Sequence, residues 1–187
     1  MNLNARIFGS SAWKILTYFF EHPCEEIYLR KLSERAKVNV FTTKEIVDAL
    51  LEENMLIERK LGKLRMFRAN TENLLFRQLK VYHTLLKLEK SGVIEYLLRN
   101  VSGVSSILLF GSAAKGEDTE KSDMDILVIG REKKRLNLEK FEKLLGRKIQ
   151  LLLFSWSELK RLAKSNRAFY EEVIAYSIEL YGFKPVV

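Results

Sequence analysis

The stretch Ile107-Leu108-Leu109-Phe110-Gly111-Ser112 is an apolar run of strand length that passes directly into a glycine turn. Ten residues after Ser112, the segment Ser122-Asp123-Met124-Asp125 leads into a second apolar run over residues 126–130. Short apolar runs bounded by turn residues are typical of buried strands. The sequence therefore predicts two strands, of which the first ends at the turn and the second begins with a pair of carboxylates.

Asp123 and Asp125 are two residues apart, and the period of two in a strand directs both side chains to one face. Two like charges held this close repel each other unless a cation lies between them, so the pair suits Mg²⁺ or Mn²⁺ with oxygen ligands. Gly111 lets backbone amides approach phosphate oxygens, Ser112 adds a hydroxyl, and the helix expected after them adds its positive N-terminus. Lys115 either neutralises a phosphate or is a surface residue of the turn with no role in binding. The sequence predicts a site for a metal-bound polyphosphate.

These two segments resemble the nucleotidyltransferase superfamily of DNA polymerase beta, and within it the minimal nucleotidyltransferases. The Gly-Ser-x-Ala-Arg-Gly and Ser-Asp-x-Asp segments of that group are similar to residues 111–116, with Lys115 in place of arginine, and to residues 122–125. The likeness covers about residues 92–182, and it includes a helix at 138–145, a third strand at 148–154 and a closing helix at 166–181.

The resemblance implies that Asp123 and Asp125 are catalytic and hold two Mg²⁺ ions, which bridge a nucleoside triphosphate and align an acceptor hydroxyl for attack at the α-phosphate. It implies that Gly111, Ser112 and Lys115 bind the nucleotide. The family's third carboxylate lies on the next strand, where this chain has Gln150. A neutral amide accepts no proton at working pH, and general-base help is worth roughly 10²–10⁴ in rate. We therefore expect nucleotide binding with weak transfer.

The N-terminal third has a different pattern. Apolar residues at helical spacing predict helices at 12–20 and 28–36, and a third that begins at a cap formed by Thr42 or Thr43 and continues to residue 51. Two strand-like segments at 56–60 and 64–68 flank Gly62, which favours a tight hairpin. Three helices and a hairpin, in this order, resemble the winged helix-turn-helix domains of archaeal and bacterial regulators over about residues 10–70.

The winged-helix interpretation predicts a surface that binds double-stranded DNA. The hairpin has five bases and no acid between residues 59 and 68, which suits a phosphate backbone, and the third helix would present its first turn to the major groove. The predicted nucleic-acid-binding residues are Thr42, Thr43, Lys44, Arg59, Lys60, Lys63, Arg65 and Arg68. A winged helix used for dimerisation or protein docking is the alternative, because a fold alone does not specify function.

The fold class is therefore predicted as α/β: a winged helix domain at 1–70, a helical connector at 71–91 and a nucleotidyltransferase-like mixed sheet with flanking helices at 92–187. The chain of 187 residues carries 32 Lys+Arg against 24 Asp+Glu. Its single cysteine excludes an intramolecular disulfide and a cysteine-rich zinc site. We find no signal peptide and no membrane-spanning run, so we expect a cytoplasmic protein with no membrane partner.

Two functions follow from these patterns. The first is a DNA-binding regulator whose nucleotidyltransferase-like domain binds nucleoside triphosphate and magnesium with little transfer. The second is an active nucleotidyltransferase that moves a nucleoside monophosphate onto a hydroxyl of a protein, a small molecule or a nucleic acid. One form of such an enzyme would be an antitoxin that modifies a toxin partner. The apolar face of the connector also predicts a homodimer.

Overall fold

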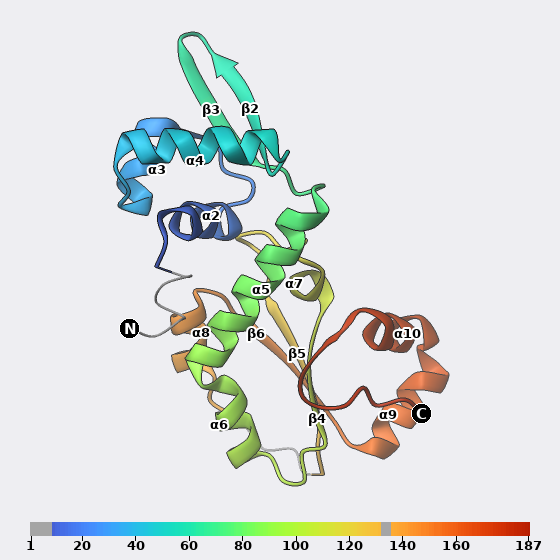
Figure 1. Ribbon diagram of the computed structural model, residues 1–187. Helices are drawn as coiled ribbons and strands as arrows, with labels where there is room; N and C mark the ends of the chain where they lie inside the picture. The colour runs from blue at the N-terminus through green and yellow to red at the C-terminus, as the bar shows by residue number, and fades with distance from the viewer. Residues whose placement is uncertain (1–8, 132–135) are drawn as a thin grey trace. The chain divides into compact units, whose positions relative to one another are not determined.

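The computed structural model describes residues 9–131 and 136–187, and the chain divides into two compact units, Met1–His83 and Thr84–Val187. The division falls within one helix, α5 (Leu74–Ser91). Figure 1 shows helices and sheets in both units, so the fold is mixed α/β as expected.

Among residues 9–73 of the N-terminal unit, three helices and a small antiparallel sheet come before α5. These elements are α2 (Ser11–Glu21), β1 (Ile27–Tyr28), α3 (Leu29–Ala36), α4 (Val40–Glu52), β2 (Leu56–Leu61) and β3 (Leu64–Ala69). The helix predicted from residue 28 begins at Leu29, because Ile27 and Tyr28 pair with Phe67 and Met66 of β3 as a short strand.

The N-cap of α4 corrects the prediction that Thr42 or Thr43 begins this helix. Asn39 is the cap, and its side-chain oxygen accepts a hydrogen bond of 2.8 Å from the backbone N–H of Thr42. Asparagine is among the best N-cap residues, and the two apolar residues after it do not prevent the helix from starting there.

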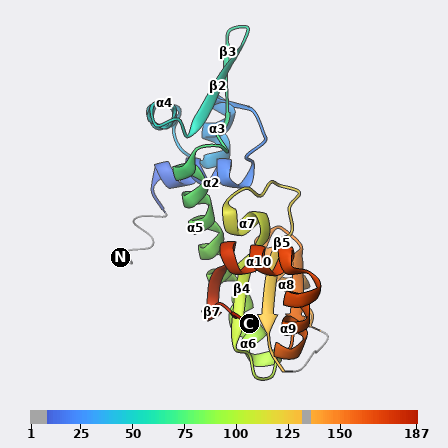
Figure 2. The ribbon, with the colours of Figure 1, turned by 90° about the vertical axis from the view of Figure 1, so that its right-hand side faces the viewer.

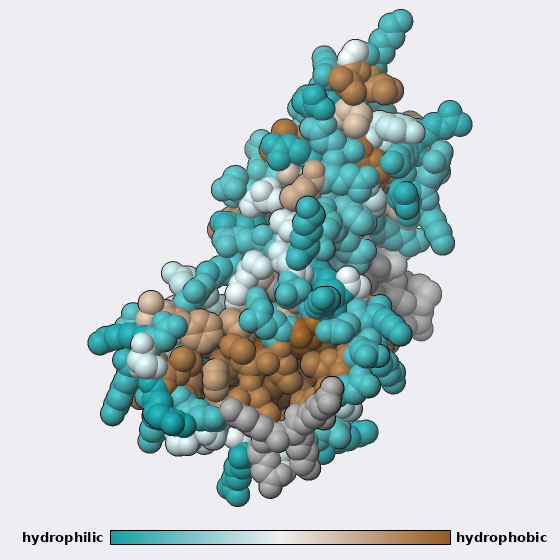
Figure 3. All heavy atoms as spheres, turned by 180° about the vertical axis from the view of Figure 1, so that it is seen from behind, coloured by the Kyte–Doolittle hydropathy of each residue, from teal (hydrophilic) through white to brown (hydrophobic). Residues whose placement is uncertain are grey.

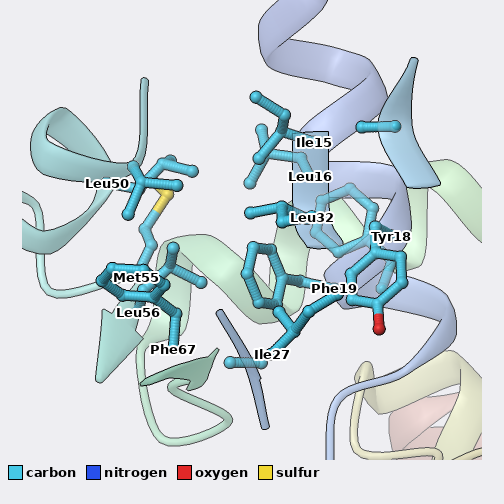
Figure 4. Packing of buried hydrophobic residues seen from close by; sticks show 14 of the residues in the cluster. Ile15, Leu16, Tyr18, Phe19, Ile27, Leu32, Leu50, Met55, Leu56 and Phe67 are labelled. Carbon is cyan, nitrogen blue, oxygen red and sulfur yellow. The ribbon is translucent and has the colours of Figure 1, made fainter. Parts of the chain in front are cut away.

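Aromatic and aliphatic side chains from α2, α3 and the sheet form the core of this unit. Phe19, Ile27, Leu32 and Phe67 are all almost fully buried, and Figure 4 shows their packing. Phe76 of α5 belongs to the same core. Because the strand Leu64–Ala69 contributes to this core through Phe67 and Ala69, the base of the hairpin is anchored.

The C-terminal unit is built on one four-stranded sheet. After α5 its elements are α6 (Val93–Asn100), β4 (Ser106–Phe110), α7 (Gly111–Lys115), β5 (Met124–Ile129), α8 (Glu139–Leu145), β6 (Ile149–Phe154), α9 (Trp156–Ser165), α10 (Arg167–Tyr176) and β7 (Ile178–Gly182). The strand order is β6-β5-β4-β7, in which β5 and β6 are parallel and the other pairs are antiparallel.

Both faces of this sheet are covered. Ile107, Leu109, Ile126 and Val128 pack on one face with residues of α6 and α8, whereas the alternate residues Leu108, Phe110, Leu127 and Ile129 pack on the other face with Leu159 of α9 and Val173 of α10. Figure 2 shows α9 and α10 on the side of the sheet that faces the viewer. Burial on both faces explains why these strands read as unbroken apolar runs.

The closing helix predicted at 166–181 is wrong in its C-terminal part. The helix α10 ends at Tyr176, and Ser177 is extended with ψ 155. Residues Ile178–Gly182 form the edge strand β7, which pairs with β4. Apolar residues continue at helical spacing past residue 176, but hydrogen bonding to β4 outweighs this local preference.

On the face that Figure 3 shows, hydrophilic residues cover much of the surface, and hydrophobic residues gather in places. Hydrophobic atoms lie near the free end of the hairpin, where Leu61 and Leu64 are about half exposed. A broader hydrophobic area lies on the C-terminal unit in the same view. Among the described residues, no helix combines the length and the apolar character that crossing a bilayer requires.

Candidate functional site

The predicted nucleic-acid-binding residues of α4 differ in exposure. Thr43 is fully buried, and its hydroxyl donates a 2.8 Å hydrogen bond to the backbone oxygen of Asn39, so it is not available to a ligand. Thr42 is partly exposed and its hydroxyl accepts from the Asn39 amide at 2.9 Å. Lys44 is exposed, and its ammonium lies 2.8 Å from Asp48.

Two of the five hairpin bases are held by carboxylates from outside the interval 59–68. Arg59 forms an ion pair with Glu26, which precedes β1. Arg65 pairs with Glu58 of β2 at 2.8 Å and with Asp48 of α4 at 3.0 Å. The Lys44 ammonium and then the Arg65 guanidinium hold the pKa of Asp48 below its ordinary value. Within the described ranges, Lys60, Lys63 and Arg68 form no ion pair, although, after Arg59 and Arg65, Arg68 and Lys60 lie near enough to Glu26 and Glu58 to lower the pKa values of these carboxyl groups.

In the C-terminal unit, the Gly-Ser turn and the second aspartate meet. Phe110, the last residue of β4, pairs with Asp125 of β5. Gly111 follows with φ +70, and a Cβ atom placed on it would overlap a carboxylate oxygen of Asp125. Only glycine satisfies both the left-handed backbone conformation and this close approach. The predicted convergence of residues 111 and 125 is therefore present in the structure.

The two aspartates interact electrostatically. Asp125 is partly buried at the start of β5, and Asp123 is exposed in the residue before the strand. Burial, and then the negative charge of Asp123, raises the pKa of Asp125 above its ordinary value. A carboxylate whose ionised form is disfavoured by burial and by a neighbouring carboxylate is suited to a divalent cation with oxygen ligands.

Gln150 occupies the position next to Asp125 in the sheet. The parallel strands β5 and β6 place Asp125 opposite Gln150, so both side chains project from the same face of the sheet. Later residues of both strands on this face pack against α9 and α10. Gln150 is exposed. Among the described residues, no group of three or more His, Cys, Asp or Glu side chains is placed to hold a metal ion.

The two residues predicted to assist phosphate binding have other contacts. Lys115 donates a 2.7 Å hydrogen bond to Glu172 of α10, and its ammonium lies 4.7 Å from the centre of the Tyr176 ring. Binding of a phosphate by Lys115 stays a prediction, and such binding would require the ion pair with Glu172 to break. Ser112 is partly exposed in α7, which is only five residues long. A single helical turn supplies little of the dipole that the sequence analysis assigned to it.

A family model described as "Polymerase beta, Nucleotidyltransferase" matches residues 93–184. These residues form a nucleotidyltransferase domain of the polymerase beta type. The match begins in α6 and ends just after β7, so it contains Gly111, Asp123, Asp125 and Gln150. The nucleotidyltransferase fold expected for this half of the chain is thereby confirmed. A search of curated proteins finds no match.

Solved structures resemble the chain only distantly. A chain from a toxin-antitoxin structure with AMP-PNP has 22% identity and a TM-score of 0.37, and the alignment covers 49% of this chain and 72% of that one. A protein described as a nucleotidyltransferase from Sulfolobus solfataricus has 14% identity and a TM-score of 0.34, covering 55% and 86%. TrmBL2, an archaeal chromatin protein, has 19% identity and a TM-score of 0.31, covering 90% and 74%.

An ion pair that the sequence analysis missed fixes the loop before Asp123 in the nucleotidyltransferase domain. The carboxylate of Asp118 is fully buried and accepts a hydrogen bond from Arg147, which lies between α8 and β6. The backbone N–H of Met124 also donates a 2.8 Å bond to Lys148. Asp118 in the loop and Met124 at the start of β5 are thus each joined to a residue just before β6. No local pattern indicates a pairing between residues 29 positions apart.

Proposed function

We propose that the nucleotidyltransferase domain binds a nucleoside triphosphate together with Mg²⁺ or Mn²⁺, and that it transfers nucleotides weakly. The observation that supports this most directly is the close approach of Gly111 to Asp125, with Asp123 near enough to raise the pKa of Asp125. A glycine turn against a pair of carboxylates provides room for a phosphate chain and ligands for a cation within one small region.

The residues present fit the metal. Asp123 and Asp125 would hold it, and the raised pKa of Asp125 gives the pair an electrostatic reason to accept a cation. The bound ion would supply positive charge to neutralise the phosphates. Gly111 and Ser112 would hold the phosphates through backbone amides and a hydroxyl. Gln150 could offer an amide oxygen beside Asp125, but it cannot take up the proton of an acceptor hydroxyl.

Titration calorimetry of the full chain with MgATP and MgGTP tests the binding proposal. We expect heat that depends on the metal and disappears in Asp123→Ala with Asp125→Ala. Glu179→Ala with Glu139→Ala, which removes two exposed acids of β7 and α8 in the same unit, is the matched control and should bind as the natural chain does. No metal-dependent heat in the natural chain with any triphosphate would refute the proposal.

An active enzyme is the second candidate, because the Gly111 and Asp125 contact is intact. Labelled triphosphates incubated with cell extract would show transfer to a protein, a small molecule or a nucleic acid, and an antitoxin would label its toxin partner. We expect Gln150→Asp to transfer more than the natural chain, by up to roughly 10²-fold, because it restores a base. Efficient labelling by the natural chain would instead support the active enzyme.

We further propose that the N-terminal unit is a winged helix that binds duplex DNA, which would make the protein a regulator. The support is the hairpin, in which Lys60, Lys63 and Arg68 carry charge that no ion pair in the described part of the chain compensates. The exposed Leu61 and Leu64 at the hairpin end favour the alternative of protein docking. DNA affinity that is independent of salt concentration would exclude phosphate binding and support that alternative.

A homodimer through α5 remains a proposal as well. Leu74, Leu75 and Tyr82 of this helix are about half exposed or more. Analytical ultracentrifugation of the natural chain and of Leu75→Glu would test it, since a charge in an apolar interface should shift the protein to a monomer.

A further inference from the structure

A basic hollow lies between α9 and α10 of the nucleotidyltransferase domain. Its volume is about 440 Å³, and Lys160, Lys164, Arg167, Tyr170 and Glu171 are among its lining residues. Pockets that hold small ligands have volumes of roughly 300–1,000 Å³. The hollow is therefore large enough for one nucleotide unit.

The charge of this hollow is positive after its internal contacts are taken into account. Arg167 and Glu171 neutralise each other through a 2.7 Å hydrogen bond. Lys160 and Lys164 are both exposed, and across residues 9–131 and 136–187 neither forms an ion pair. Glu158, the acid of α9, accepts hydrogen bonds from Ser155 as part of a capping box at the N-terminus of that helix. Two lysines thus remain to attract an anion.

Tyr170 supplies an aromatic surface in the same hollow. Its hydroxyl accepts a 2.8 Å hydrogen bond from the backbone N–H of residue 187, which fixes the side chain in place. The ring is partly buried and lines the hollow beside the cations. Cations combined with an aromatic side chain are the usual means of binding single-stranded nucleic acid, because the cations follow the phosphates and unpaired bases stack on the ring.

The hollow is separate from the proposed triphosphate site. At about 100° per residue, Arg167, Tyr170 and Glu171 lie on one side of α10, and Glu172 and Tyr176, which contact Lys115, lie on another. A ligand in the hollow would therefore leave the Gly111 turn accessible.

We propose that this hollow binds a nucleotide unit of single-stranded nucleic acid, with phosphates at Lys160 and Lys164 and a base against Tyr170. The two lysines lie on successive turns of α9, roughly 6 Å apart along its axis, a spacing over which a flexible strand can present two phosphates. A duplex keeps its bases stacked inside and cannot offer one to the ring.

Fluorescence anisotropy with a labelled 12-nucleotide oligodeoxythymidylate tests the proposal. The full chain would carry Lys60→Glu, Lys63→Glu and Arg68→Glu, so that the three hairpin bases without an ion pair do not contribute, and EDTA would exclude the metal site. Lys160→Glu with Lys164→Glu should weaken binding at least tenfold at 50 mM salt. It should also reduce the slope of log affinity against log salt by about 1.4, because each phosphate contact to a single strand contributes about 0.7.

The matched control is Lys140→Glu with Lys143→Glu on α8, which makes the same change of charge at exposed positions of the same unit. It should bind within twofold of the parent. Tyr170→Phe keeps the ring and should also bind normally, whereas Tyr170→Leu should bind more weakly.

Three results would overturn the proposal: unchanged binding in Lys160→Glu with Lys164→Glu, an equal loss in the α8 control, or tighter binding of a duplex of the same length. Calorimetric binding of MgATP should be unaffected by the α9 substitutions. The experiments therefore test oligonucleotide binding in the hollow and MgATP binding at the triphosphate site independently of each other.

Discussion

Arg147 donates a hydrogen bond to the buried carboxylate of Asp118 and so joins the loop before Asp123 to the start of β6. The side chain of Asp118 is 0% exposed and that of Arg147 is 12% exposed. Removal of one partner of a buried ion pair leaves the other charge buried with one fewer opposite charge beside it. This is costly even where the intact pair adds little net stability.

Arg147→Met should therefore lower the free energy of unfolding by about 3 kcal/mol, measured by urea denaturation of the full chain. Arg167→Met removes an arginine from the exposed pair with Glu171 and should leave the unfolding midpoint unchanged. The double substitution Asp118→Leu with Arg147→Met should recover part of the loss, because no buried charge remains. Equal effects of the two arginine substitutions would contradict this account.

Gly111→Ala should cost more than substitution of another glycine with the same backbone conformation. Gly111 and Gly146 have φ +70 and +72, but only at Gly111 would a Cβ meet the Asp125 carboxylate, whereas the space around Gly146 is open. Gly146→Ala should lose about 1 kcal/mol for the left-handed conformation alone. Gly111→Ala should lose more, and it should also lose MgATP binding. Retention of nucleotide binding in Gly111→Ala would show that the turn does not form the site.

Asp125→Asn should change how stability depends on pH. Since the folded-state pKa of Asp125 lies above its unfolded value, its favourable contribution is fully present below the unfolded pKa and is lost as pH rises through the folded pKa. In EDTA, Asp125→Asn should therefore be at least as stable as the natural chain at pH 7, and the advantage should disappear near pH 3. Urea denaturation at both pH values measures this. A clear loss of stability at pH 7 would contradict the predicted direction.

Lys63→Ala and Arg65→Ala should affect different properties. Lys63 forms no ion pair in the described part of the chain, so its loss should weaken duplex DNA binding and reduce the salt slope by about 0.9. Arg65 links β3 to Glu58 and Asp48, so its loss should mainly destabilise the N-terminal unit. Anisotropy with a labelled duplex and thermal unfolding separate the two effects. The same fall in salt slope for both variants would show that Arg65 also contacts phosphate.

The central strands could be predicted from sequence because residues 107–110 and 126–129 are apolar without interruption, as burial on both faces requires. The meeting of Gly111 with Asp125 followed from motif spacing. The strand β7 could not be predicted, because its stability comes from pairing with β4, about 70 residues earlier. Pairing with residues distant in sequence also explains an error for the hairpin. Because residues 59–68 contain no acid, the sequence alone led to an overestimate of how many bases of the hairpin are without an ion pair. Glu26 and Asp48, which neutralise two of its arginines, come from earlier elements.

Helix α5 contributes to two cores at once. Phe76 near its beginning is fully buried with the aromatic residues of α2, and Leu88 near its end is fully buried with the residues of α6 and β4. A protease cut or a truncation on either side of this helix would therefore take a core side chain away from one of its neighbours. Fragments meant to test the proposed DNA binding and the proposed nucleotide binding separately should each retain the half of α5 that completes their own interior.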